Sequence, residues 1–143
     1  MSAVLAVYAS LVVVLCLKML AISCYQGYYR LRHLAFMNPE DAAVFKRPAQ
    51  QQERPEVLRV MQAWRNDLEN IPLFMTLGGL AVALEAPAAL MAGVGGMFTL
   101  ARVLHTVTYL AQLQPWRTLS YGVGVLCLLG LAGWIIVQVC TGV

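Results

Sequence analysis

Apolar residues fill four long stretches of the chain, and one polar stretch separates the first of them from the second. The apolar stretches cover residues 3–26, 57–84, 88–110 and 116–139, and the polar stretch covers residues 27–54. An α-helix needs roughly 20 residues to cross the ~30 Å hydrocarbon core of a bilayer, and each apolar stretch is long enough. The pattern predicts an all-α membrane protein, a bundle of four transmembrane helices that forms one domain over residues 1–143.

The composition supports this class and excludes others. Hydrophobic residues make up 60% of the chain and charged residues only 12%, which is too apolar for an ordinary soluble domain. The net charge is +3 and no basic run is longer than Lys46-Arg47, so we expect no nucleic-acid partner. The cysteines lie in apolar stretches without CxxC spacing, which predicts buried thiols and neither disulfides nor a metal site: Cys16, Cys24, Cys127 and Cys140.

Turn-forming and charged residues concentrate in the polar stretch. Asn38-Pro39-Glu40-Asp41 has the composition of a helix start, with Asn38 as the cap, Pro39 in the first helical position and two carboxylates near the positive helix end. We therefore expect a short interfacial helix around residues 39–45.

The second apolar stretch has ionisable residues at its start. Its continuous apolar part, Ile71 to Leu84, has 14 residues and a helical length of about 21 Å, which is too short to cross the hydrocarbon core. The preceding turns must therefore supply the missing length. Arg65, Asn66 and Glu69 share one side of this helix, at spacings of three and four residues. Asp67 falls off that side, and we expect it to be a structural partner.

Further ionisable residues interrupt the other apolar stretches. Burying a charge in a bilayer costs roughly 2.5–3.5 kcal/mol, so such side chains usually face a bundle interior or a water-filled site. Arg102, His105 and Tyr109 recur at i, i+3 and i+7, which predicts one functional stripe on a helix. For Lys18 two interpretations are open: its long stem extends to the membrane surface, which is slightly favoured, or it points into the bundle.

Polar residues at the start of the fourth stretch, and glycines in the third, lead to two more predictions. Arg117, Ser120 and Tyr121 lie at i, i+3 and i+4. Because Arg117 follows Trp116, two interpretations of Arg117 are equally open: it forms an interfacial anchor pair with Trp116, or it is a site residue. In the third stretch Gly93, Gly95 and Gly96 predict close helix packing.

The loop charges predict the orientation. Nearly all extramembrane Lys and Arg residues lie in the polar stretch and in the third connection, so both connections should face the cytoplasm and both termini the opposite side. The membrane is then a bacterial inner membrane or one of the endoplasmic-reticulum type. On this topology the polar clusters reach one cytoplasmic depth and predict a single pocket. Its guanidinium groups suit a ligand with several carboxylates or a thiolate.

Together these motifs resemble the MAPEG family of membrane-associated proteins in eicosanoid and glutathione metabolism, in the branch of microsomal glutathione transferase and microsomal prostaglandin E synthase. The resemblance runs from Lys18 to about Val123. Its motifs are Arg30-Leu31-Arg32, Asn38-Pro39-Glu40-Asp41, Arg65-Asn66-Asp67-Leu68-Glu69-Asn70, and Arg102-Val103-Leu104-His105-Thr106 with Tyr109-Leu110.

The resemblance implies a homotrimer that binds glutathione as co-substrate between subunits near the cytoplasmic face, and a lipophilic electrophile that arrives from the bilayer. It implies Arg117, nearest to the thiol, with Thr118 and Asp41 as catalytic residues. The glutathione-binding residues that it implies are Arg65, Asn66, Glu69, His105, Tyr109, Arg117, Ser120 and Tyr121, with Arg30 reaching in from the neighbouring subunit.

The implied activity is that of a membrane glutathione transferase that activates glutathione as a thiolate, with reduction of lipid hydroperoxides as a second activity. A glutathione-dependent isomerase of the prostaglandin E synthase type is an alternative. In that synthase a serine follows the arginine, where this chain has Thr118, whereas the Arg117-x-Leu119-Ser120 spacing is closer to the transferase. An alternative of another class is a non-catalytic lipid-binding scaffold.

Overall fold

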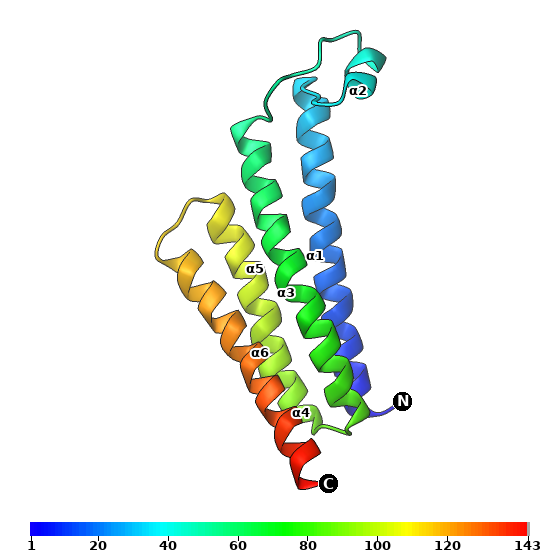
Figure 1. Ribbon diagram of the computed structural model, residues 1–143, viewed down its shortest axis with the longest axis vertical. Coiled ribbons are helices and arrows are strands. Elements are labelled where there is room, and N and C mark those ends of the chain that lie inside the picture. The colour runs from blue at the N-terminus through cyan, green and yellow to red at the C-terminus, as the bar shows by residue number, and fades with distance from the viewer. Residues whose placement is uncertain (143) are drawn as a thin grey trace.

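The computed structural model describes residues 1–142, and this part of the chain contains helices and no strands (Figure 1). Helix α1 (Ala3–His33) leads through the short α2 (Pro39–Val44) to α3 (Pro55–Ala83). The next rod consists of α4 (Ala88–Leu90), a π-helical turn η1 (Met91–Gly95) and α5 (Gly96–Leu110), and the last is α6 (Trp116–Thr141). The predicted all-α class is confirmed.

The four rods pack into a bundle in which α1 lies beside α3, and α6 contacts both α3 and α5. Both termini lie at one end, and the loop around α2 and the α5–α6 loop lie at the other (Figure 1). The bundle contains an apolar core, in which Phe74 and Phe98 stack with their ring centroids 4.6 Å apart. The largest fully buried apolar side chains of this core are Leu15, Ile71, Phe74, Met91, Phe98 and Leu131.

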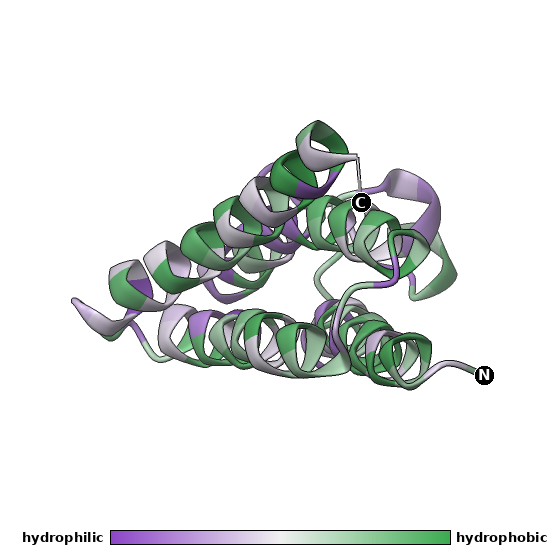
Figure 2. Ribbon diagram, turned by 90° about the horizontal axis from the view of Figure 1, so that it is seen from below, coloured by the Kyte–Doolittle hydropathy of each residue, from purple (hydrophilic) through white to green (hydrophobic). Residues whose placement is uncertain are grey.

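Within residues 1–142, three helical rods are long and apolar enough to cross a membrane: α1, the Ala88–Leu110 rod, and α6. Apolar residues continue around their surfaces (Figure 2), and many of them are exposed, which suits contact with lipid or with another chain. The chain is therefore a membrane protein. Helix α3 does not belong to this apolar set because ionisable residues, Arg59, Arg65, Asp67 and Glu69, fill its first half. A fourth span and the homotrimer stay predictions.

Helix α1 extends to His33, past residue 26, where the predicted span ends. Residues 27–33, which were predicted as part of the polar loop, are therefore helical. No proline interrupts this segment, and Arg30, Arg32 and His33 in the last turn complement the negative end of the helix dipole. The helix ends at Leu34, which adopts a left-handed conformation with φ 47° and donates its N–H to carbonyls of the last turn.

The short helix predicted in the loop is confirmed as α2, with Pro39 in its first position. Asn38 precedes it as expected, but its side chain does not cap the helix. Its amide nitrogen instead donates to Oδ2 of Asp41 at 3.2 Å, which holds the predicted catalytic carboxylate within α2.

Packing at the glycines and cysteines agrees with the predictions only in part. A Cβ at Gly95 would lie 2.8 Å from Cδ1 of Leu11, so this glycine does permit close packing of the third rod on α1. A Cβ added at Gly93 or Gly96 would meet no atom of another element within 4 Å, so the same prediction is wrong for them within one chain. All four cysteines are free, and only Cys127 is buried, because Cys24 and Cys140 lie on outer helix faces.

Candidate functional site

An ion pair between Lys18 of α1 and Asp67 of α3 lies in the bundle interior. Asp67 is 0% exposed and the Lys18 side chain 11% exposed. The interpretation that Lys18 extends to the membrane surface is therefore wrong, because a buried carboxylate offers the ammonium group a closer partner. The prediction that Asp67 is a structural partner is confirmed.

Arg102 of α5 is fully buried beside this ion pair and links two other helices. Its Nη1 donates to Oδ1 of Asn66 in α3 at 2.9 Å. Its Nη2 approaches the backbone carbonyls of Ser120 and Tyr121 in α6 at 3.5 and 3.4 Å. Because several oxygens surround the guanidinium, its charge is tolerated inside the bundle.

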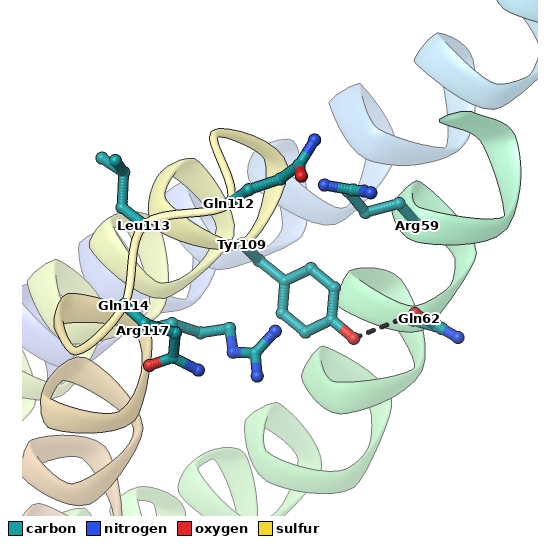
Figure 3. Close-up of a pocket in the computed structure, with 7 residues that line it drawn as sticks. All are labelled: Arg59, Gln62, Tyr109, Gln112, Leu113, Gln114 and Arg117. Carbon is teal, nitrogen blue, oxygen red and sulfur yellow. Dashed lines mark hydrogen bonds between the residues drawn. The ribbon is translucent and has the colours of Figure 1, made fainter. Parts of the chain in front are cut away.

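A polar cavity of about 280 Å³ opens near the α5–α6 loop (Figure 3). Helices α3, α5 and α6 and the connecting loop all contribute to its wall. Within it the Tyr109 hydroxyl donates to Oε1 of Gln62 at 3.0 Å, and this hydrogen bond joins α5 to α3. The lining residues are Arg59, Gln62, Tyr109, Gln112, Leu113, Gln114 and Arg117.

Two neighbours hold the Arg117 guanidinium in this cavity. Its Cζ lies 4.8 Å from the centroid of the Tyr109 ring, a cation–π distance. With its amide oxygen toward Arg117, Gln114 accepts from Nη2 at 2.7 Å and from Nε at 3.1 Å, and its amide nitrogen donates to Oγ1 of Thr118 at 3.1 Å. The predicted catalytic pair Arg117 and Thr118 thus shares one amide.

His105 lies one turn from Arg102 on the inner face of α5, buried between two tyrosines. Its ring centroid is 5.6 Å from that of Tyr109 and 6.2 Å from that of Tyr121. Its Nδ1 has no hydrogen-bond partner among the described residues. The predicted stripe Arg102, His105 and Tyr109 therefore faces inward and runs from the buried guanidinium to the cavity.

Ser120 faces the same interior but its hydroxyl is already bonded. The Oγ donates to the backbone carbonyls of Trp116 at 2.9 Å and Arg117 at 3.0 Å. The structure thus gives the Ser120 hydroxyl a role within α6, and leaves it outside the cavity lining.

Other predicted site residues do not meet this cavity within one chain. Arg65 and Glu69 form an ion pair at 3.6 Å and point outward, with side chains 82% and 61% exposed. Arg30 pairs with Glu53 at the end of α1. Asp41 lies in α2, well beyond the α5–α6 loop (Figure 1). Tyr109, Arg117 and Thr118 therefore lie together within one chain, and the predicted site charges named in this paragraph lie away from them.

Several cavity residues were not predicted from the sequence: Arg59, Gln62, Gln112 and Gln114. A signal for two of them was present, because Arg59, Gln62 and Asn66 recur at i, i+3 and i+7 along α3. Chemically, the cavity offers two guanidinium groups and three amides without a lining carboxylate. This set favours anions, and bidentate binding of carboxylates in particular.

The MAPEG family model matches residues 8–137. The chain belongs to the MAPEG family. The match includes most of α1 and α6, and all of the helices between them. The interior ion pair and the polar cavity therefore both lie within the family domain.

Individual relatives carry two different names. The chain is 38% identical over 109 residues to a prostaglandin E synthase of Macaca fascicularis, covering 75% of this chain and 71% of the relative. To the Mus musculus prostaglandin E synthase it is 42% identical over 104 residues, covering 71% and 66%. To the Homo sapiens microsomal glutathione S-transferase 1 it is 38% identical over 125 residues, covering 82% and 79%.

Proposed function

We propose that this chain is a membrane glutathione transferase that binds glutathione as a thiolate and directs it to lipophilic electrophiles. The observation that carries the proposal is the Arg117 guanidinium, held over the Tyr109 ring and by Gln114 at the wall of a polar cavity. A fixed cation beside a thiol stabilises the ionised form, which is the nucleophile. The similarity to a microsomal glutathione S-transferase supports the choice of thiol.

Glutathione has two carboxylates, one ammonium group and one thiol, and the charges of the chain suit each. The guanidinium of Arg59 in the cavity would bind a carboxylate. Glu69 would accept from the ammonium group, beside Arg65 and Asn66. The thiol proton leaves to solvent, and Arg117 stabilises the sulfur anion. The thiolate then forms a carbon–sulfur bond while the leaving group departs with its electron pair.

Thr118 and Asp41 complete the catalytic set that we propose. The Thr118 hydroxyl bonds the same amide that holds Arg117, so it lies beside the thiol-stabilising group. Asp41 would act at the entrance of the site from α2.

A homotrimer would bring the outward charges to a site. Arg65 and Glu69 point away from their own bundle, and Arg30 pairs with Glu53 and does not line the cavity that contains Arg117 in the same chain. Highly exposed residues can serve a binding site when a second subunit covers them. We propose that Arg30 of each chain serves the site of its neighbour, that the site faces the cytoplasm, and that both termini lie on the opposite side of a bacterial inner or reticulum-type membrane.

Purified protein in detergent should conjugate glutathione to an aryl halide. Arg117→Ala should abolish this turnover, because the sulfur anion loses its cation. Arg47→Ala, which removes an exposed arginine of the loop, should leave turnover unchanged. Calorimetry tests the scaffold alternative: if wild-type protein gives neither glutathione-binding heat nor turnover, the enzyme proposal fails and the non-catalytic scaffold stands.

The second candidate is a glutathione-dependent isomerase of the prostaglandin E synthase type. The 42% identity to the Mus musculus synthase favours it. A substrate panel with glutathione separates the activities: an aryl halide tests conjugation, a lipid hydroperoxide tests reduction, and a prostaglandin endoperoxide tests isomerisation. Turnover of the endoperoxide alone would replace the transferase proposal with the isomerase.

A further inference from the structure

We infer that Gly124 of α6, which has no side chain, leaves the space that the Arg102 guanidinium occupies; we call this space the seat. We also infer that this contact makes Arg102 a positioning residue for Asn66 and Tyr121. The inference rests on the proposed function, because Asn66 and Tyr121 are glutathione-binding residues in that proposal. Arg102 itself is fully buried, so it acts through these two residues.

The close contact at Gly124 identifies the seat. A Cβ added there would lie 2.5 Å from Nη2 of Arg102, and 3.0 Å from both Cζ and Nε. Real Cβ contacts below 3.0 Å essentially do not occur, so any other residue at this position must displace the guanidinium. No backbone atom is among these contacts, so the side chain of Arg102 gives way while α6 keeps its path.

The surroundings of Arg102 decide what its displacement would change. Its Nη1 bonds Oδ1 of Asn66, and its Cζ lies 5.6 Å from the ring centroids of both Phe98 and Tyr121. If the guanidinium moves, the Asn66 amide loses its charged partner, and the Tyr121 ring loses the cation beneath it. Both residues would then sample several orientations before glutathione binds, which weakens binding.

Arg117 should not be affected by this displacement. Gln114 and Tyr109 hold its guanidinium, and neither of them contacts Arg102 by a hydrogen bond or cation–π interaction. Loss of the seat should therefore weaken glutathione binding without slowing the chemical step at saturating glutathione. A general loss of folded protein would lower the apparent kcat and leave KM unchanged, so the two effects are separable.

The test uses Gly124→Ala with Gly122→Ala as its matched control. Gly122 lies in the same helix, and a Cβ there meets no heavy atom within 4 Å. Both substitutions make the same gain in helix propensity, so a difference between them reports the seat. We expect Gly124→Ala to raise the KM and Kd for glutathione about tenfold or more, the loss typical of a hydrogen bond to a charged group, with kcat within about threefold. Gly122→Ala should match wild type.

Arg102→Lys is the second variant. If Gly124→Ala does not fold, this variant still tests whether Arg102 is a positioning residue. Lysine keeps the interior charge but lacks the planar fork, so it cannot bond Asn66 and the α6 carbonyls together. We expect the same rise in KM. Equal KM values for Arg102→Lys and wild type would overturn the inference, as would equal KM values for the two glycine variants.

Hydrogen exchange provides a readout that needs no glutathione. Amides of α6 around residues 120–125 should exchange faster in Gly124→Ala than in Gly122→Ala, because the displaced guanidinium no longer braces this turn. If wild-type protein fails to bind glutathione, the proposed function is wrong. The comparison of exchange rates in the two glycine variants then tests by itself whether Gly124 makes room for the Arg102 guanidinium. Equal exchange in the two variants would overturn it.

Discussion

Lys18 and Asp67 pair in the bundle interior and join α1 to α3, while Oδ1 of Asp67 has no hydrogen-bond partner among the described residues. A buried charge pair repays its desolvation only with good geometry and additional hydrogen bonds. Arg102 contributes a second positive charge nearby, and its Nη1 bonds Asn66, the residue before Asp67. The pair is therefore part of a small charged centre that links α1, α3 and α5.

Lys18→Met should destabilise the protein by roughly 3–5 kcal/mol, because it leaves the Asp67 carboxylate buried without its partner. The double variant Lys18→Met with Asp67→Leu should lose much less, since no uncompensated charge remains. The thermal unfolding midpoint in detergent measures both. Equal losses for the single and double variants would contradict this explanation.

The exposed ion pair on the same helix provides a control for that measurement. Arg65→Gln breaks the pair with Glu69, whose partners are 82% and 61% exposed. Exposed pairs in a helix contribute about 0.3–0.5 kcal/mol, so the unfolding midpoint should barely change. A large shift would show that the method does not separate interior from surface charge.

Much of the fold follows from the apolar pattern because helices in lipid must satisfy their own backbone. The helices of the structure overlap each predicted apolar stretch, since apolar runs of this length have few other solutions. It missed the end of α1, where Tyr28, Tyr29 and Leu31 continue the helix beyond the apolar stretch. Composition marks where the apolar part ends, whereas capping geometry at Leu34 marks where the helix ends.

The contact of Gly95 with α1 leads to a stability prediction. A Cβ at Gly95 would lie 2.8 Å from Cδ1 of Leu11 and 3.2 Å from Cζ of Phe74. Gly95→Ala should therefore cost about 1–3 kcal/mol, the usual penalty of overpacking. Gly93→Ala meets no atom within 4 Å and should leave the unfolding midpoint unchanged or raise it. Equal midpoints for the two variants would show that the third rod is not tightly packed on α1.

Two substitutions at Tyr109 separate its roles toward Arg117. Tyr109→Phe keeps the ring 4.8 Å from the guanidinium and removes only the hydrogen bond to Gln62. Tyr109→Leu removes the ring. A cation–π contact contributes about 0.5–2 kcal/mol, so Tyr109→Leu should lower kcat/KM about tenfold, and Tyr109→Phe by about threefold or less. Steady-state kinetics with an aryl halide measures both, and equal losses would assign the role to the hydroxyl.

The site was harder to predict than the fold because helical spacing reveals a shared face but not which face points inward. The i,i+4 spacing of Arg65 and Glu69 was correct, yet both side chains point away from the bundle. Gln114 holds Arg117 from an irregular loop, where no periodicity applies. The sequence of one chain does not show whether a charge acts in its own bundle or in that of another subunit.

A mixed-subunit experiment tests whether Arg30 and Arg117 act across a subunit boundary. Arg30→Ala and Arg117→Ala should each be inactive as pure assemblies, because every site lacks one guanidinium. In a cyclic trimer each interface joins two different surfaces, so a mixed assembly contains interfaces with both arginines intact. Random mixing of equal amounts should restore about a quarter of wild-type turnover, since each side of an interface has an even chance of the required chain.

Co-expression with two affinity tags, followed by tandem purification, isolates the mixed assemblies. One interface in each mixed trimer has both arginines intact, so the turnover of this purified fraction should rise to about a third of the wild-type value. A matched mixture of Arg117→Ala with Thr118→Ala chains provides the control. Both substitutions lie in the same half of the site, so no interface regains an intact pair and turnover should stay low. If the mixture of Arg30→Ala and Arg117→Ala also stays inactive while wild-type protein purified in the same way turns over, Arg30 does not serve the neighbouring site. Its ion pair with Glu53 would then be structural, stabilising the end of α1 against the loop.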